Sequence, residues 1–431
     1  MAELTAPTPV APAASAKIAS AAPASQRLMS VDALRGFDMF WIIGAGYIVY
    51  ALHQMSKNPV TDFLADQLEH VPWEGVRFYD LIFPLFVFIM GVSAVFSLTK
   101  TIEQEGRSMA VKRVIRRGVL LFIIGLIYSG GARNLWPEIR LMGVLNRIAL
   151  CYLFGGLIFC FFKTRGMVVI SVALLLGYWA IMGLVPIRDI RLAKYKTEEN
   201  HVLQKNDIEQ LYQETGTKDA NAIFYSTTNW VTGKYDKGYN VANHFDFQHL
   251  RGAKYDTYWD PEGILSTIPA IATCLLGIFA ALLLRSPNYC DKWKVIYLLS
   301  FGAGGVILGF LWGLEFPVVK KIWSSSYVLV AGGFSAIALG VFYQIVDVWK
   351  YQKWCQPFVW MGMNSITIYL TSSFIGGFRE PARRLAGGDV KAFFDAHIAK
   401  GAGDMVISIA SLLLAFWFVH FLYRRKIFLR L

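Results

Sequence analysis

The chain has 431 residues, of which 55% are hydrophobic, 15% aromatic and only 17% charged. This balance lies outside the range of soluble globular proteins and predicts an all-α protein that crosses a membrane many times. The basic loops of such a protein account for the formal net charge of +12, so the charge requires no nucleic-acid partner.

The first 27 residues consist mainly of Ala, Pro and Ser, with almost no large apolar side chains. Such a segment cannot bury enough surface to fold, and it lacks the apolar core of a signal peptide. We therefore expect residues 1–27 to be a disordered cytoplasmic tail, followed by one transmembrane domain over residues 28–431.

Apolar segments of about 20 residues, the length that crosses the hydrocarbon core as a helix, recur along the rest of the chain. They predict about ten transmembrane helices in one bundle, with one large outer loop at residues 187–262. The expected spans are residues 32–53, 79–99, 117–132, 141–162, 166–186, 263–285, 294–314, 326–347, 357–376 and 404–423.

Lysine and arginine gather in alternate short loops, most densely at residues 112–117. The positive-inside rule assigns these loops and both termini to the cytoplasm, although the loop at residues 377–403 is an exception because it is also basic. No metal is expected, because the cysteines and histidines lack the spacing of metal ligands.

The large outer loop divides by composition. Residues 191–214 are charged with apolar residues at helical spacings, which predicts a surface helix. Residues 224–263 are rich in Tyr, Trp, Phe, Asn and Asp, a mixture suited to stacking on sugar rings and bonding to hydroxyls. Aromatic residues near a membrane equally form interfacial belts or pack among themselves.

Ionisable residues inside a span cost roughly 2.5 to 3.5 kcal/mol each, so each needs a partner or a function. Arg140 and Arg147 lie seven residues apart at the start of the fourth span, on one helix face. This face could hold an anionic ligand, or each arginine could pair with a carboxylate such as Glu262. Asp32 and Arg35, about one turn apart, are expected to form an ion pair.

Polar residues also occur at the edges of later spans. Asp260 and Glu262 lie in "WDPEG", where the large loop meets the sixth span, and could bind substrate or cap the helix. Asn364 and Ser365 lie inside the ninth span, where such residues bind neighbouring helices or a ligand.

His70 stands just before the second span, on the same side as the large loop, and Asp80 opens that span. A histidine in a loop is usually only solvated, but a nearby carboxylate can orient an imidazole. From spacing alone, His70 is therefore one candidate among seven histidines.

Six stretches together resemble the catalytic region of the heparan-α-glucosaminide N-acetyltransferase family, and resemble its uncharacterised bacterial relatives still more closely. They follow in the family's order and cover nearly the whole chain after residue 27. The stretches are "RLMSVDALRGFDMFWIIG", "HVPWEGVRFYDLIFPLFVFIMGVS", "RLMGVLNRIALCY", "YDTYWDPEGILSTIPAI", "FPVVKKIWSSSYVL" and "WMGMNSITIYL".

The resemblance implies a multi-span enzyme of the bacterial inner membrane that takes acetyl-CoA, as co-substrate, from the cytoplasm. The acetyl group would pass to the amine of a terminal glucosamine on the far side. His70 matches the histidine proposed to be catalytic in the family, and Arg147 and Glu262 match two further motif residues. The chain departs from the family at Gly46, where the lysosomal enzyme has an asparagine.

In such a reaction a neutral imidazole at His70 could act as general base, or could carry the acetyl group itself as an acyl-imidazole. Asp80 or Glu262 could fix the imidazole tautomer. Asn364 or Ser365 could donate a hydrogen bond to the developing oxyanion.

The phosphates of CoA need a basic site, and Arg113, Arg116 and Arg117 at the inner end of the third span are the candidates; the positive-inside rule alone also explains them. Two other functions stay open from the sequence. One is an O-acyltransferase acting on a periplasmic glycan, and the other is a secondary transporter. The sequence also leaves open a homodimer.

Overall fold

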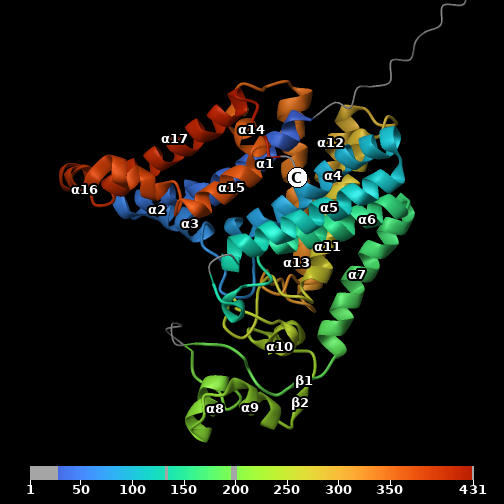
Figure 1. Cartoon of the computed structure of the whole chain (residues 1–431), viewed down its shortest axis with the longest axis vertical. Helices are drawn as coiled ribbons and strands as arrows, with labels where there is room; N and C mark the ends of the chain where they lie inside the picture. The colour runs from blue at the N-terminus through green and yellow to red at the C-terminus, as the bar shows by residue number, and fades with distance from the viewer. Residues whose placement is uncertain (1–27, 132–133, 196–200, 430–431) are drawn as a thin grey trace, which may run out of the picture.

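The computed structural model describes residues 28–131, 134–195 and 201–429, and these residues form an all-α membrane protein (Figure 1). Four two-residue strands make two small antiparallel ladders, β1 with β2 and β3 with β4. The strands are β1 (Ile187–Arg188), β2 (Trp230–Val231), β3 (Tyr235–Asp236) and β4 (Tyr239–Asn240).

Seven helices in the described part of the chain are long and apolar enough to cross a membrane, and they coincide with seven of the ten expected spans. Two of these helices continue a short neighbouring helix, η2 (Phe78–Leu81) before α4 and η5 (Tyr343–Val348) after α13. The seven are α4 (Ile82–Glu105), α6 (Val144–Phe161), α7 (Thr164–Leu184), α11 (Thr267–Arg285), α12 (Asp291–Gly313), α13 (Ser325–Phe342) and α17 (Ala402–Arg424).

The other three expected spans are helical but interrupted or charged. The first is broken by a π-helix, η1, in which Gly44 has a φ of 136° that side-chain-bearing residues rarely adopt. The third begins as α5 in the basic residues and ends in a second π-helix, η3, where Ser129 and Gly130 depart from helical angles, and the ninth is broken at Asn364. These elements are α1 (Met29–Phe40), η1 (Trp41–Ala45), α2 (Gly46–Met55), α5 (Arg107–Leu126), η3 (Ile127–Gly131), α14 (Gln356–Met363) and α15 (Ser365–Phe374).

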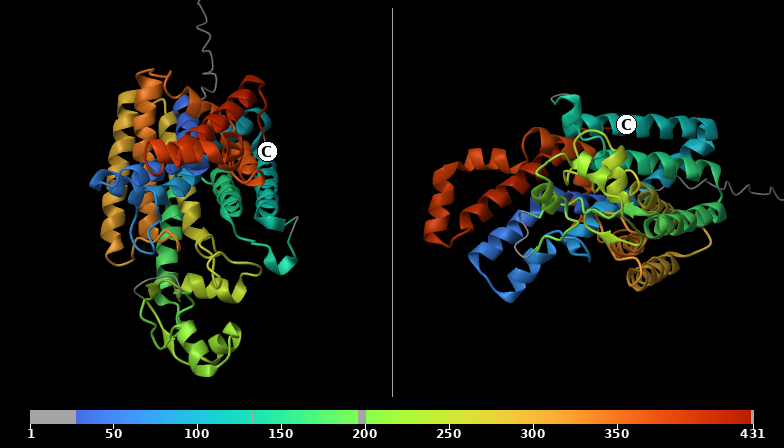
Figure 2. Two further views of the ribbon diagram at one scale, coloured as in Figure 1. Left: turned by 90° about the vertical axis from the view of Figure 1, so that its left-hand side faces the viewer. Right: turned by 90° about the horizontal axis from the view of Figure 1, so that it is seen from below.

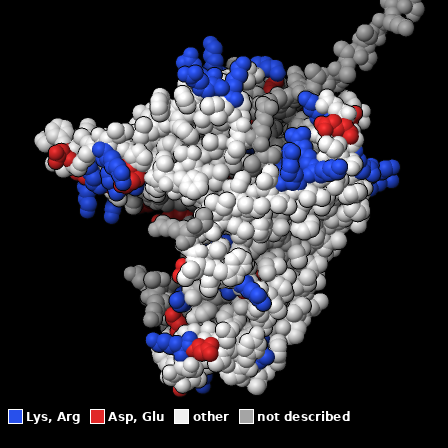
Figure 3. All heavy atoms as spheres, in the orientation of Figure 1, with Lys and Arg blue, Asp and Glu red and all other residues white. Residues whose placement is uncertain are grey.

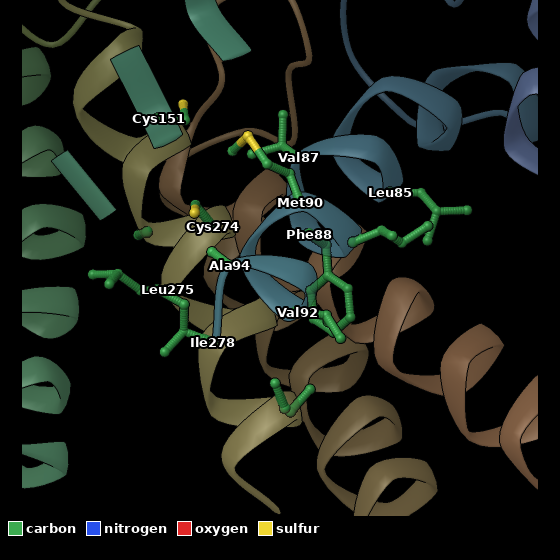
Figure 4. Packing of buried hydrophobic residues seen from close by; sticks show 14 of the residues in the cluster. Leu85, Val87, Phe88, Met90, Val92, Ala94, Cys151, Cys274, Leu275 and Ile278 are labelled. Atoms are coloured by element: carbon green, nitrogen blue, oxygen red, sulfur yellow. The ribbon is translucent and has the colours of Figure 1, made fainter. Parts of the chain in front are cut away.

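Helices α4 and α11 form the centre of the largest apolar core. Figure 4 shows Ala94 of α4 next to Cys274 of α11 within this core. The two backbones approach so closely that a Cβ atom on Gly91 would overlap a carbonyl oxygen of α11. A Cβ on Gly277 would likewise overlap a carbonyl oxygen of α4. Small residues at such crossings allow extensive van der Waals contact between membrane helices.

Helices α1 and α14 form a second close pair. A Cβ on Gly36 would overlap the carbonyl oxygen of Phe358, and a Cβ on Gly362 would overlap the carbonyl oxygen of Asp32. Residues from η1, α14, α15 and α17 complete a smaller core on this side of the bundle. Close backbone contact therefore recurs in the bundle, in α4 with α11, in α1 with α14 and also in α12 with α13, where a Cβ on Gly333 would overlap the carbonyl oxygen of Gly302.

An elongated part of the molecule, with α2, α17 and the helices α3 (Pro59–Gln67) and α16 (Arg379–His397), projects to one side of the bundle (Figures 1 and 2). The large loop forms a lobe below the bundle in Figure 1. Figure 3 shows basic side chains gathered on the upper part of the molecule, and a broad face without charge between them and the lobe. The helices of the lobe are α8 (Ile208–Thr215), α9 (Ala220–Ser226) and α10 (Val241–His249).

The lobe differs from the expected surface helix at residues 191–214. Only its last part, α8, is helical among the described residues, whereas Leu192 is extended and its N–H bonds to the carbonyl of Gly238. Burial of Leu192 in the lobe's core outweighs the helical spacing of the sequence. Part of the segment, residues 196–200, lies outside the described residues.

Most lobe aromatics pack together, as one of the interpretations of the sequence predicts. Trp259 and Phe224 are buried in one small core and Tyr239 in another. Tyr225, Trp230 and Tyr255 are exposed and available for other contacts.

Candidate active site

A cavity of about 460 Å³ runs through the bundle between α1, α4, α5, α6 and the α14–α15 break. Helix α4 contributes residues from Ile82 to Ser97, which at 1.5 Å per residue corresponds to roughly 22 Å of helix. His70 and Lys320 line the part of the cavity next to the lobe. Arg117 of α5 and Ser97 of α4 also belong to the lining. The cavity is therefore long, with titratable and charged groups in its lining.

His70, Asp80 and Lys320 meet at this lining although they come from three separate segments. The Nδ1 atom of His70 lies 2.8 Å from Oδ1 of Asp80 and 3.0 Å from Nζ of Lys320. Lys320 Nζ also lies 3.2 Å from the same carboxylate oxygen. Asp80 is 1% exposed, whereas the His70 side chain is half exposed and lines the cavity.

The local backbone fixes Asp80 in this position. Its Oδ2 accepts from the backbone N–H groups of Val71 and Arg77, both at 3.2 Å, which closes the loop between His70 and α4. The hydroxyl of Tyr327, on α13, donates to the Asp80 carbonyl at 2.6 Å. The carboxylate thus holds the loop and the imidazole at the same time.

Glu262 lines the cavity and belongs to a compact ion-pair network. Arg140 binds both oxygens of Asp260 at 2.7 Å, and its Nη2 also contacts Glu262. The exposed ring of Tyr255 lies over the Arg140 guanidinium, 5.2 Å from ring centroid to Cζ. The alternative that Arg140 pairs with Glu262 is therefore observed, and Asp260 joins the pair.

Arg147 is fully buried behind the cavity wall and is not among the residues that line it. Its Nη2 donates to the Ser266 hydroxyl and, at 3.3 Å, to the Gly263 carbonyl. Its Cζ lies 5.0 Å from the ring centroid of Trp323, and Nε and Nη1 make no hydrogen bond within the described ranges. Arg147 thus supports the segment that carries Glu262.

Asn364 and Ser365 line the cavity at the break between α14 and α15. Asn364 donates to the Trp360 carbonyl at 3.2 Å, while its side-chain oxygen is buried without a hydrogen-bond partner in the described structure. A break in a membrane helix frees backbone and side-chain groups, which is tolerated where they face a cavity.

The basic cluster of the third span divides between two places. Arg117 lines the main cavity, and its Cζ lies 4.7 Å from the ring centroid of Tyr152. Arg113 and Arg116 line a separate groove with the end of α4, where Arg113 donates to the Thr101 hydroxyl at 3.0 Å. Arg116 points about 100° away from Arg117 around the helix, whereas Arg113 shares a face with Arg117 but lies one turn, roughly 6 Å, away along α5.

Two charged residues, Lys320 and Arg35, line the cavity although the sequence interpretation gave them no place in the site. Lys320 was missed because it lies 250 residues from His70; its signals were a pair of lysines in a loop expected on the outer side and its place in one of the six stretches that carry the family resemblance. Arg35 forms the expected ion pair with Asp32, at 3.5 Å, and also lines the cavity and binds Ser93. Gly46 starts α2 and is not a lining residue.

Asp246 of α10 supports the Glu262 segment from the lobe, and its titration gives a pH prediction. Its carboxylate accepts from the N–H of Ile264 at 3.0 Å, and burial raises its pKa to about 7, from roughly 4 in an unfolded chain. The folded protein binds this proton more tightly, so this contribution to stability is complete below about pH 4 and is lost as pH rises to 7.

We therefore expect Asp246→Asn to flatten the fall in stability between about pH 4 and 7, measured as the unfolding temperature in detergent at each pH. Asp236→Asn, at an exposed lobe carboxylate, is the control and should keep the slope. Equal slopes in both variants would exclude Asp246 as its source.

Comparison with known proteins identifies sequences similar to this chain. A family model described as the catalytic region of heparan-alpha-glucosaminide N-acetyltransferase matches residues 27–201, which include His70, Asp80 and Arg117. The mouse (Mus musculus) protein of that name is 27% identical over 376 residues, covering 80% of this chain and 53% of that protein. The human (Homo sapiens) protein is 27% identical over 373 residues, covering 80% and 52%. The chain spans about half the length of these curated relatives. Over 80% of its length, it is therefore similar to heparan-α-glucosaminide N-acetyltransferases.

Proposed function

We propose that the protein is a membrane-embedded acetyltransferase that moves an acetyl group from acetyl-CoA to the amine of a glucosamine-type sugar. The observation that carries the proposal is the cavity that has both Arg117 and His70 in its lining, with His70 bound to the buried Asp80. The similarity to heparan-α-glucosaminide N-acetyltransferases supports the same reaction.

In the proposed reaction His70 acts as general base. Its Nδ1 is occupied by Asp80 and Lys320, which leaves Nε2 to take a proton from the acceptor amine. The amine nitrogen attacks the thioester carbon, a C–N bond forms and the C–S bond breaks. The proton then passes from His70 to the CoA thiolate, giving the N-acetylated sugar and free CoA. Asn364 and Ser365 would donate to the carbonyl oxygen as it gains charge.

Acetyl-CoA would enter from the end of the cavity near Arg117, which we propose faces the cytoplasm together with both termini. Ser97 lines the cavity and Thr101, one turn further along α4, lines the groove of Arg113 and Arg116. The two basic sites are therefore adjacent, as phosphates at the two ends of a bound nucleotide would require. Arginine suits phosphate binding because its planar fork donates in pairs.

The acceptor sugar would approach from the lobe, which we propose lies outside the cytoplasm of a bacterial inner membrane. Glu262 reaches the cavity and is positioned by Arg140 and Asp260, and through Ser266 by Arg147. The exposed ring of Tyr255 beside Arg140 offers a stacking surface for a sugar ring. A carboxylate at Glu262 would bind the amine or hydroxyls of the acceptor.

The test is acetyl transfer by the purified protein with acetyl-CoA and glucosamine, followed as amine-dependent release of CoA. Transfer to a hydroxylated glycan, but not to glucosamine, would make the protein an O-acyltransferase with the same cavity. Failure to bind acetyl-CoA in the absence of any gradient would overturn the proposal in favour of a transporter.

Replacing Arg117 by alanine is expected to weaken acetyl-CoA binding by about 10-fold or more, because a charged hydrogen bond contributes roughly 1.5 to 3 kcal/mol. Titration calorimetry of the detergent-solubilised protein measures the Kd. The double variant Arg113→Ala with Arg116→Ala tests the groove separately.

Lys163→Ala removes a basic residue that lines neither site and serves as the control for the loss of one charge. Equal affinity for the Arg117 and Lys163 variants would remove Arg117 from the CoA site.

A further inference from the structure

Lys320 has no role in the reaction as described so far, although it reaches the same atoms as the proposed base. It lies between α12 and α13, in a segment held to the His70 loop by a hydrogen bond from the Gly75 N–H to the Val318 carbonyl at 2.9 Å. Glu74 and Val319 form an isolated bridge alongside. The position of the Lys320 side chain is therefore set by the same backbone contacts that hold the loop.

The three atoms His70 Nδ1, Asp80 Oδ1 and Lys320 Nζ lie within 2.8 to 3.2 Å of one another. Nδ1 can donate its proton to the carboxylate, or it can accept one from the ammonium, but it cannot do both. With the proton on Nδ1, Asp80 accepts hydrogen bonds from the neutral imidazole and from the Lys320 ammonium, and Nε2 keeps its lone pair. A second proton on the ring would place an imidazolium beside the ammonium, which Coulomb repulsion opposes.

We propose that Lys320 is a positioning residue of the acetyl-transfer reaction, which keeps His70 neutral and makes its imidazolium give up the captured proton readily. The inference rests on the proposed function. It gives the two partners of His70 opposite tasks: Asp80 orients the ring and stabilises charge on it, and Lys320 limits that charge. An imidazolium next to a cation passes its proton to the CoA thiolate more readily than one next to a carboxylate alone.

The other described groups around His70 do not fit the role proposed for Lys320, a positive charge next to the imidazole. Tyr79 lies with its ring 5.0 Å from the imidazole, and Arg77 donates to the His70 carbonyl while its charge is paired with Asp66. Glu262 lines the same cavity but is bound to Arg140. Among the described residues within hydrogen-bond distance of the imidazole nitrogens, Lys320 is the cation.

The neighbouring lysine provides a matched control. Lys321 lies 3.5 Å from Asp256 and 5.7 Å from the ring centroid of Trp259, and it is not a cavity residue. Its side chain is 25% exposed and that of Lys320 is 20% exposed. Substitution of either residue therefore removes one charge from the same loop at similar burial.

The experiment is NMR titration of the His70 ring, with labelled histidine in the full-length protein without substrate. Lys320→Met should move the pH at which the ring signals titrate upward by about one unit or more. The acidic limb of the pH–rate profile should move in the same direction. Lys320→Arg should restore most of the shift because it keeps the charge, and Lys321→Met should leave the titration unchanged.

Equal titration in Lys320→Met and Lys321→Met would overturn the inference. If Lys320→Met does not fold, Lys320→Gln keeps a polar end and carries the same prediction. The titration needs no substrate, so its outcome is separate from that of the proposed function. A shifted titration in a protein that transfers no acetyl group would refute the acetyltransferase while leaving the effect of Lys320 on His70 in place.

Discussion

Replacement of His70 by alanine is expected to lower the rate of acetyl transfer by about 10²- to 10⁴-fold, the usual contribution of a positioned general base. The variant lacks the group that takes the amine proton, while Arg117 and the apolar walls of the cavity remain. Acetyl-CoA should therefore still bind with an affinity close to that of the unaltered protein. Amine-dependent CoA release and calorimetric binding, measured on the same preparation, separate the two effects.

The protein contains a matched control for this substitution. His53 also pairs with an aspartate, Asp62, at 2.8 Å, but this pair lies at the surface between α2 and α3 and does not line the cavity. His53→Ala should keep full activity. A similar loss in both variants would indicate a general effect on folding, and no loss in His70→Ala would refute the base.

Replacement of Arg140 by alanine is expected to destabilise the protein by about 3 to 5 kcal/mol, because removal of one partner leaves buried charges uncompensated. The Asp260 side chain is fully buried and the Glu262 side chain is 13% exposed, so neither gains water in exchange. Arg140→Lys should recover part of the loss, because an ammonium keeps the charge but loses the two-pronged contact.

Denaturation by SDS in mixed micelles measures the free energy of unfolding of these variants. Arg285→Ala breaks a surface pair with Glu103, 3.5 Å long and partly exposed on both sides, and should cost at most about 1 kcal/mol. Adding Asp260→Asn to Arg140→Ala should relieve part of the damage. A loss in Arg140→Ala no larger than in Arg285→Ala would show that the network does not contribute to stability.

The sequence predicts elements that are local and periodic better than contacts that are not. Seven long apolar helices appear where hydropathy predicts them. The breaks at Gly44 and Asn364 could not be foreseen, because mean hydropathy is insensitive to a single backbone angle or a helix restart. The prediction of a helix at residues 191–214 of the lobe was wrong for a related reason, since burial of Leu192 against residues distant in sequence outweighed the helical spacing.

The site shows the same difference between local contacts, which the sequence predicts, and contacts between distant residues, which it does not. Asp80 is ten residues from His70 across one tight loop, and their contact was among the expected arrangements. Lys320 reaches the same atoms from 250 residues away, which no spacing rule can indicate. Arg116 and Arg117 are neighbours in sequence but line different cavities, a separation that sequence spacing alone does not show.

The glycine contacts limit how the cavity can change its width. Because α4 touches the backbone of α11, and α1 touches that of α14, neither pair can slide or separate without opening a gap at its centre. We therefore expect each pair to move as one unit, and the cavity lies between them with α4 on one wall and α1 on the other. Widening the passage for a bulky substrate would require one body to swing against the other, with the irregular turns at Gly44 and Asn364 as the available hinges.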